Sequence, residues 1–160
     1  MGNAKQMVAN FSFLGDKYHT SLLEHAEEFL GRKDTSADPE LAAYKRMEKP
    51  KCGDCYMNAQ KFVISHPDAK YYEGYWWGGM FPVHHGWVVL DGQVIDFTAE
   101  DCDRKVKDMT GEVRDPATND YFGMHVPTEF VVKAMFASRL WTTVTGDYLT
   151  FLATGEEPAR

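Results

Sequence analysis

The sequence predicts an α+β fold, with helices in the first part of the chain and a small antiparallel sheet after them. Apolar residues recur at helical spacing before residue 67, whereas residues 69–98 read as strands around an Asp-Gly pair typical of two-residue hairpin turns. Helices and strands that are grouped along the chain are typical of α+β proteins. The 160 residues, 44% of them hydrophobic, suffice for one core, so we expect a single domain over residues 1–160.

Three helices are expected in the first part of the chain. They cover residues 17–29, residues 40–49, and a stretch that begins at Asp54 or Cys55 and stops at His66-Pro67. In each, apolar positions lie three or four residues apart. Gly31 is a candidate C-terminal cap of the first helix, Asp38-Pro39 suits the start of the second, and Pro50 ends it.

Four strands and a last helix are expected in the second part. The expected strands are residues 69–77, 83–90, 93–98 and 121–126, and the expected helix runs from residue 128 to about residue 140. Asp91-Gly92 should join the second and third strands as a hairpin. Residues 99–120 are polar, and we expect an irregular surface excursion there.

The net charge of the chain disfavours some classes of binding partner. With 17 Lys and Arg against 24 Asp and Glu, the formal net charge is −7, which repels nucleic acid and anionic lipid. No apolar run approaches the roughly 20 residues that span a bilayer. We therefore expect neither a nucleic-acid partner nor a membrane partner.

The cysteines are three in number: Cys52, Cys55 and Cys102. An odd number, with an N-terminus that lacks the pattern of an export signal, predicts reduced thiols and a cytoplasmic location. Their chemistry, if any, should be nucleophilic, metal-binding or redox.

Cys55 is the best candidate nucleophile, because it stands where a helical pattern begins. A thiolate at a helix N-terminus is stabilised by the positive end of the helix dipole and by free backbone N–H groups, which makes it a better nucleophile at neutral pH. The alternative is a buried, inert cysteine.

Strand parity brings a histidine and an aspartate together. If Asp91-Gly92 is a two-residue loop, the facing pairs are Leu90–Gln93, Val89–Val94, Trp87–Asp96 and His85–Thr98. Since side chains alternate, His85 and Asp96 share one face as diagonal neighbours, and His84 points to the other. A carboxylate beside an imidazole fixes its tautomer and stabilises the imidazolium.

Two other outcomes remain for the aspartate. Asp96 could cap a turn or accept a backbone N–H. A loop of another length would change the parity, and Asp91 or Asp101 would then be the third member of the set.

The order of these residues resembles an enzyme superfamily. Cys52-Gly53-Asp54-Cys55-Tyr56 resembles the C-G-[SA]-C-[WY] segment of papain-like proteases, with Cys55 at the nucleophile position. The span from Cys55 to Asp96 resembles the papain-like and transglutaminase-like superfamily, in which a nucleophile helix packs on an antiparallel sheet that carries the His and then an Asp or Asn. A group of small bacterial and phage-type proteins is similar in Cys55-Tyr56-x-Asn58-Ala59, Tyr72-Glu73-Gly74-Tyr75, His85-Gly86-Trp87 and Ile95-Asp96-x-Thr98.

The resemblance implies a cysteine enzyme of the acyl-transfer type without a cofactor. Cys55 would attack a carbonyl or a side-chain carboxamide, His85 would take and return the proton, and Asp96 would orient His85. Water as the acceptor would make the protein a protease, amidase or deamidase, and an amine would make it a transferase. The expected substrate is a peptide or an amide, including one on a protein.

The substrate-binding residues are less well marked. Papain-like enzymes carry an oxyanion-hole Gln six residues before the nucleophile, where this chain has Lys49. The donors would then be the backbone N–H of Cys55 and another group, for which Asn58 is a candidate. The aromatic candidates for lining a substrate cleft are Tyr75, Trp77 and Trp87.

Metal binding and a non-catalytic role are the alternatives. His25-Ala26-Glu27, with Pro50 and the pair Cys52 and Cys55, is similar to the H-x-E…P-C-x-x-C signature of zinc nucleobase deaminases, although the proline is not adjacent to the first cysteine. Cys52, Cys55 and His84 could also hold a structural zinc ion. A binding module that keeps the fold would have an unreactive Cys55.

Overall fold

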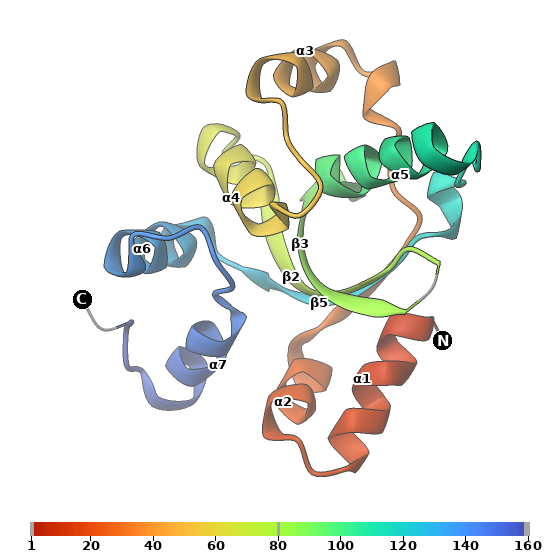
Figure 1. Ribbon diagram of the computed structural model, residues 1–160. Coiled ribbons are helices and arrows are strands. Elements are labelled where there is room, and N and C mark those ends of the chain that lie inside the picture. The colour runs from red at the N-terminus through yellow and green to blue at the C-terminus, as the bar shows by residue number, and fades with distance from the viewer. Residues whose placement is uncertain (1, 80, 159–160) are drawn as a thin grey trace.

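The computed structural model describes residues 2–79 and 81–158 (Figure 1). Within them, five strands form one curled antiparallel sheet in the order β1-β5-β2-β3-β4. The strands are β1 (Glu27–Leu30), β2 (Lys70–Trp77), β3 (Pro82–Leu90), β4 (Gln93–Ile95) and β5 (Asp120–Val126). The α-helices are α1 (Asn3–Phe13), α2 (Lys17–His25), α3 (Pro39–Glu48), α4 (Cys55–Ser65), α5 (Phe97–Thr110), α6 (Thr128–Ser138) and α7 (Thr145–Thr154). The fold is α+β, and none of the described helices is both long and apolar enough to cross a bilayer.

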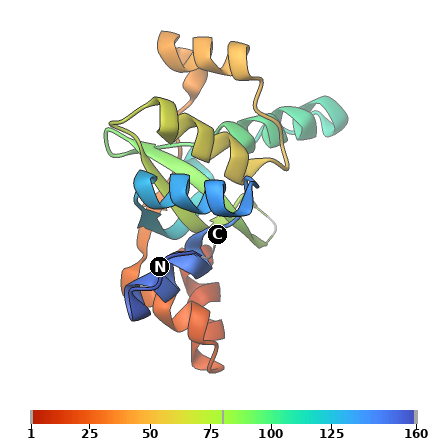
Figure 2. The ribbon, with the colours of Figure 1, turned by 90° about the vertical axis from the view of Figure 1, so that its left-hand side faces the viewer.

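Helices cover both faces of the sheet. On one face, α4 and α6 pack over β2 and β3, where Phe62 joins Tyr71 and Val88 in one apolar cluster. Farther along the same face, α1 and α2 pack against Phe122 of β5. On the opposite face, the first turn of α5 lies against an aromatic cluster that includes Trp87. Figures 1 and 2 show α1 and α2 at one end of the molecule and α3 and α5 at the other.

The β3–β4 hairpin is confirmed, but its second strand is short. Leu90 pairs with Gln93 and Val88 with Ile95, which is the register expected of a two-residue loop at Asp91-Gly92. The expected strand over residues 93–98 is wrong beyond Ile95. Because β4 stops there, the outer edge of β3 before Val88 has no strand partner among the described residues.

The chain leaves the sheet at Asp96 because this residue caps a helix. Its carboxylate accepts a hydrogen bond from the backbone N–H of Ala99 at 2.9 Å, a standard N-cap contact. The expectation of an irregular excursion over residues 99–120 is therefore wrong for the part that α5 occupies. The helical signal was weak because its buried residues, Phe97, Thr98 and Ala99, all lie in the first turn.

The first expected helix is also too long. Helix α2 ends at His25, Ala26 is extended, and the next residues form β1, which pairs with β5. Phe29 explains the difference, because its ring packs edge-on against Tyr72 of β2 at a centroid distance of 5.0 Å. Pairing with a distant strand thus overrides the helical pattern, and Gly31 follows a strand rather than a helix.

The other expected elements are confirmed within a few residues. They are α3, α4, β2, β3, β5 and α6. Helices α1 and α7 were not recognised as such from the sequence.

Candidate active site

His85 and Asp96 form a buried pair between β3 and the start of α5. The Nε2 atom of His85 lies 2.8 Å from Oδ2 of Asp96, and the two side chains are 4% and 1% exposed. The hydroxyl of Tyr121 donates to the same oxygen at 3.0 Å, while Oδ1 accepts from the N–H of Ala99. These donors hold the carboxylate in one orientation, facing the imidazole.

The junction between β4 and α5 explains this contact. The expected pairs of Trp87 with Asp96 and His85 with Thr98 do not form, since the strand ends at Ile95. Asp96 still meets His85 because one of its oxygens caps α5 and the other turns toward β3. The parity of the strands therefore predicts the correct neighbours, although the ladder itself does not reach them.

The pair carries opposite charges at neutral pH. Burial lowers the pKa of His85, but the Asp96 carboxylate and the Cys55 side chain outweigh it and raise the pKa to about 10. Burial raises the pKa of Asp96, yet the charge of His85 and the hydrogen bonds from His85, Ala99 and Tyr121 leave it lowered. Burial and the nearby Asp96 raise the pKa of Tyr121, so its hydroxyl stays protonated and donates.

Cys55 is the first residue of α4 and keeps a free, partly exposed thiol. Its side chain lies near the imidazole of His85 and contributes to the raised pKa of that group. Since Nε2 of His85 is bonded to Asp96, Nδ1 is the ring nitrogen left for the sulfur. Helix α4 packs on the face of the sheet opposite to His85, and the edge of β3 next to His85 has no strand partner among the described residues.

The N-terminus of α4 suits a developing negative charge. No side chain caps it, and the backbone N–H groups of its first turn have no partner within the helix. These groups and the positive end of the helix dipole can stabilise an anion next to the sulfur. The site can therefore move a proton through His85 and stabilise an oxyanion next to the sulfur.

His84, the neighbour of His85, forms hydrogen bonds with other residues on the opposite face of β3. Its Nδ1 lies 2.7 Å from the hydroxyl of Tyr56, and its Nε2 lies 2.7 Å from the hydroxyl of Tyr18. Burial lowers the pKa of His84, although the Glu73 carboxylate 4.0 Å away opposes this. His84 is therefore neutral at pH 7 and does not contact Cys55 as the base would.

Two of the four expected substrate-binding residues are structural. Both amide hydrogens of Asn58 are used, because Nδ2 donates to the carbonyl of Lys51 at 2.9 Å and to Oγ1 of Thr98 at 2.8 Å. Trp87 is fully buried beneath α5 and cannot reach a ligand. The expectation that Asn58 and Trp87 bind substrate is therefore wrong.

The other two expected substrate-binding residues lie half-buried on β2. Tyr75 and Trp77 share the face that carries His84, next to α1 and α2. The hydroxyl of Tyr75 lies 2.9 Å from Nε2 of His19. They are on the Tyr56 side of β3, not on the side of Asp96.

A disulfide between Cys52 and Cys102 corrects the expectation of three reduced thiols. It joins the loop before α4 to α5, and the backbone N–H of Cys52 also donates to Asp101 at 2.8 Å. Cys52 therefore offers no thiolate to a metal ion, which rules against both zinc arrangements that pair it with Cys55. In residues 2–79 and 81–158, no three His, Cys, Asp or Glu side chains are gathered as metal ligands.

The same contacts exclude the other candidates for the third residue of the set. Asp101 binds the loop at Cys52 and the side chain of Arg104. Asp91 lies in the hairpin turn with a φ of 51° and is exposed.

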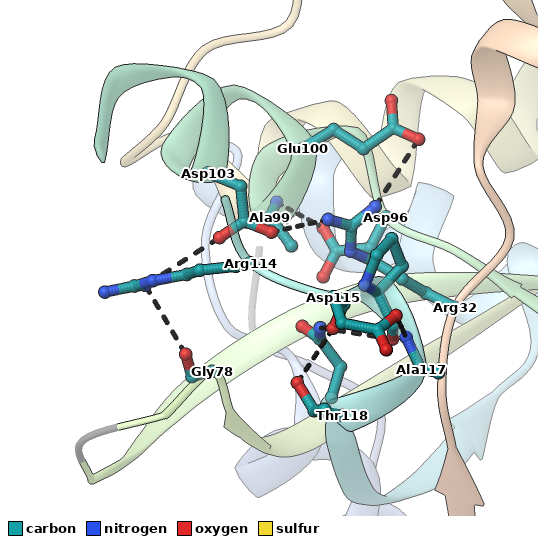
Figure 3. A network of polar contacts seen from close by, with 12 residues as sticks. Arg32, Gly78, Asp96, Ala99, Glu100, Asp103, Arg114, Asp115, Ala117 and Thr118 are labelled. Carbon is teal, nitrogen blue, oxygen red and sulfur yellow. Dashed lines mark hydrogen bonds and ion pairs between the residues drawn. The ribbon is translucent and has the colours of Figure 1, made fainter. Parts of the chain in front are cut away.

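A polar network anchors α5 and thereby Asp96 (Figure 3). The buried guanidinium of Arg32 lies 2.5 Å from Asp103 and 3.6 Å from Glu100, so it joins two carboxylates of α5 to the segment after β1. Arg114 extends the network from Asp103 to the carbonyl of Gly78, at 3.4 Å. The sequence does not predict that Arg32 and Tyr121 help to position Asp96. Each contacts residues more than 20 positions away, and no local pattern indicates such contacts.

Comparisons of this chain with protein-family models, with curated proteins and with solved structures find no match.

Proposed function

We propose that the protein is a cysteine-dependent acyl-transfer enzyme that acts on a peptide or amide. Cys55 is the nucleophile, His85 transfers the proton, and Asp96 orients His85 and stabilises its charge. The observation that carries the proposal is the buried 2.8 Å contact of His85 with Asp96, together with the free thiol of Cys55, whose side chain contributes to the raised pKa of the same imidazole.

The reaction follows from these contacts. The Cys55 thiolate attacks the carbonyl carbon of the amide, and the backbone N–H groups at the start of α4 stabilise the oxyanion. His85 gives its proton to the leaving amine as the C–N bond breaks and a thioester forms. His85 then takes a proton from water or from an acceptor amine, which attacks the thioester and releases Cys55.

The arrangement of elements also supports this proposal. A helix that opens at Cys55 packs on an antiparallel sheet, and the His and Asp follow in chain order. This order resembles that of a papain-like or transglutaminase-like core. The disulfide at Cys52 removes one argument for a cytoplasmic location, since disulfides persist mainly in oxidising compartments.

Alkylation of Cys55 tests the proposal without a known substrate. In the oxidised protein, iodoacetamide should label Cys55 rapidly at pH 6, where a free thiol is almost unreactive. Cys55→Ala should abolish labelling and any hydrolysis or transfer with a panel of amide substrates. The control Ser36→Ala, which removes an exposed hydroxyl that donates to Asp34, should change neither. An unreactive Cys55 at pH 6 would favour a non-catalytic binding module.

A further inference from the structure

Two adjacent histidines of β3, on opposite faces of the strand, lie near two adjacent residues of α4. His85 lies near enough to Cys55 for that side chain to contribute to its raised pKa, and Nδ1 of His84 lies 2.7 Å from the hydroxyl of Tyr56. Neighbours in each element are one residue apart, so the second contact restrains the first. Together they fix how the first turn of α4 is rotated about its axis relative to β3.

His84 is itself held firmly, so it can serve as an anchor. Tyr18 of α2 bonds its other ring nitrogen at 2.7 Å. The rings of Tyr18, Tyr56 and Tyr75 surround the imidazole at centroid distances of 6.1, 6.0 and 5.2 Å. The side chain is only 26% exposed. An anchor with contacts to α2, α4 and β2 can resist movement of the first turn of α4.

Both hydrogen bonds of His84 survive at neutral pH. A neutral imidazole has one donor and one acceptor nitrogen, and a tyrosine hydroxyl can play either part, so both tautomers keep both bonds. Burial and neighbouring negative groups raise the pKa values of Tyr18 and Tyr56, so both hydroxyls stay protonated. The contact is needed at this end of α4, where no side chain provides an N-cap.

We propose that Tyr56 and His84 are positioning residues. The hydrogen bond between Tyr56 and His84 holds Cys55 against His85. The proposal rests on the function proposed above, because it gives Cys55 and His85 their roles as nucleophile and base. It adds His84 on the opposite face of β3 and Tyr56 on α4, neither of which has a role in the proposed reaction steps.

Tyr56→Phe tests this proposal because it removes one oxygen and keeps the ring. The rate of alkylation of Cys55 by iodoacetamide is measured in the oxidised protein at pH 6 and at pH 9. A loosened contact with His85 should lower the pH 6 rate by about fivefold or more, while the pH 9 rate, where any thiol ionises, should change less than about twofold. A purely structural role for Tyr56 would not move this ratio of rates.

The matched control is Tyr44→Phe, since the hydroxyl of Tyr44 makes no hydrogen bond within the part of the chain that the structure describes. It should keep the wild-type ratio of rates. A second pair of variants covers the case in which Tyr56→Phe folds poorly: His84→Gln keeps a donor and an acceptor and should retain more of the pH 6 rate than His84→Ala.

The outcomes separate the two proposals. If wild-type Cys55 reacts rapidly at pH 6 and Tyr56→Phe and His84→Ala react equally fast, the positioning role is overturned and the proposed function stands. If wild-type Cys55 reacts at pH 6 only as slowly as an ordinary thiol, the proposed function fails, and the positioning role fails with it.

Discussion

His84 and His85 are neighbours on one strand, each has a carboxylate nearby, and yet their charge states differ. The pKa of His85 is raised to about 10 although burial opposes it, whereas burial prevails at His84 and lowers its pKa. Asp96 is 2.8 Å from His85, while Glu73 is 4.0 Å from His84. The difference of about one ångström separates a hydrogen-bonded ion pair from a weaker interaction at longer range.

The other hydrogen-bond partners of Asp96 and Glu73 explain why one carboxylate lies closer to its histidine than the other. Glu73 is fully buried and turned toward the N-terminus of α7, where it accepts hydrogen bonds from the N–H groups of Val144 and Thr145 and the hydroxyl of Thr143. Tyr71 donates to its other oxygen at 2.7 Å. Asp96 caps a helix too, but with one oxygen, and its other oxygen contacts both His85 and the hydroxyl of Tyr121. A carboxylate can therefore sit beside a histidine without charging it, when backbone donors already hold it elsewhere.

Removing the charges of Asp96 and Glu73 in separate variants should show the largest difference between the two carboxylates. Asp96→Asn should lower the pH 6 alkylation rate of Cys55 by roughly ten- to a hundredfold, because the imidazolium loses its counter-ion. Glu73→Gln should leave that rate within about twofold, although it loosens α7. The measurement is the second-order rate with iodoacetamide in the oxidised protein.

Equal losses of rate in the two variants would contradict the division of roles. A small loss in Asp96→Asn alone would agree with the resemblance, since the superfamily also uses Asn at this place. The melting temperature of each variant provides the control for folding.

The stability of the protein at alkaline pH should report the His85–Asp96 pair directly. The pKa of His85 in the folded protein is about 10, above the ordinary value near 6.5, so its stabilisation is complete below pH 6.5 and is lost as pH rises toward 10. Wild type should lose about 1–3 kcal/mol more unfolding free energy than Asp96→Asn between pH 6.5 and 10. Denaturant titrations at three pH values in this range measure the difference, and parallel curves would argue against the ion pair.

His84 should give a smaller effect on the acid side. Its pKa in the folded protein is lowered, so its contribution to stability is complete above pH 6.5 and is lost as pH falls below that value. Wild type should lose up to about 1 kcal/mol relative to His84→Gln between pH 6.5 and 5. If His84→Gln instead loses more than wild type over this interval, His84 is stabilised as a cation, and its assignment as neutral is wrong.

The sequence predicted what depends on short-range rules. The Asp91-Gly92 turn sets the register of β3 and β4, and alternation from that turn puts His85 and Asp96 on one side and His84 on the other. The position of Cys55 at a helix start is equally local. The placement of Cys55, His85 and Asp96 can therefore be predicted from patterns that span only a few positions each.

What the sequence could not predict depends on contacts between distant segments. Strand β1 forms because Phe29 packs on Tyr72, which no local pattern shows. Trp87 belongs to the expected aromatic set, but only the position of α5 shows that it is fully buried. The partner of Cys52 could not be chosen by counting cysteines, because three cysteines allow three pairings.

The Cys52–Cys102 disulfide makes a covalent ring of the central part of the chain, with its ends 50 positions apart. Cys55, His85 and Asp96 all lie inside this ring. Even in an unfolded chain they cannot move apart beyond the span of the loop, which reduces the conformational entropy that folding must remove. A break in the backbone anywhere within the ring would also leave the two pieces joined, so the three residues belong to one covalent unit that does not depend on an intact main chain.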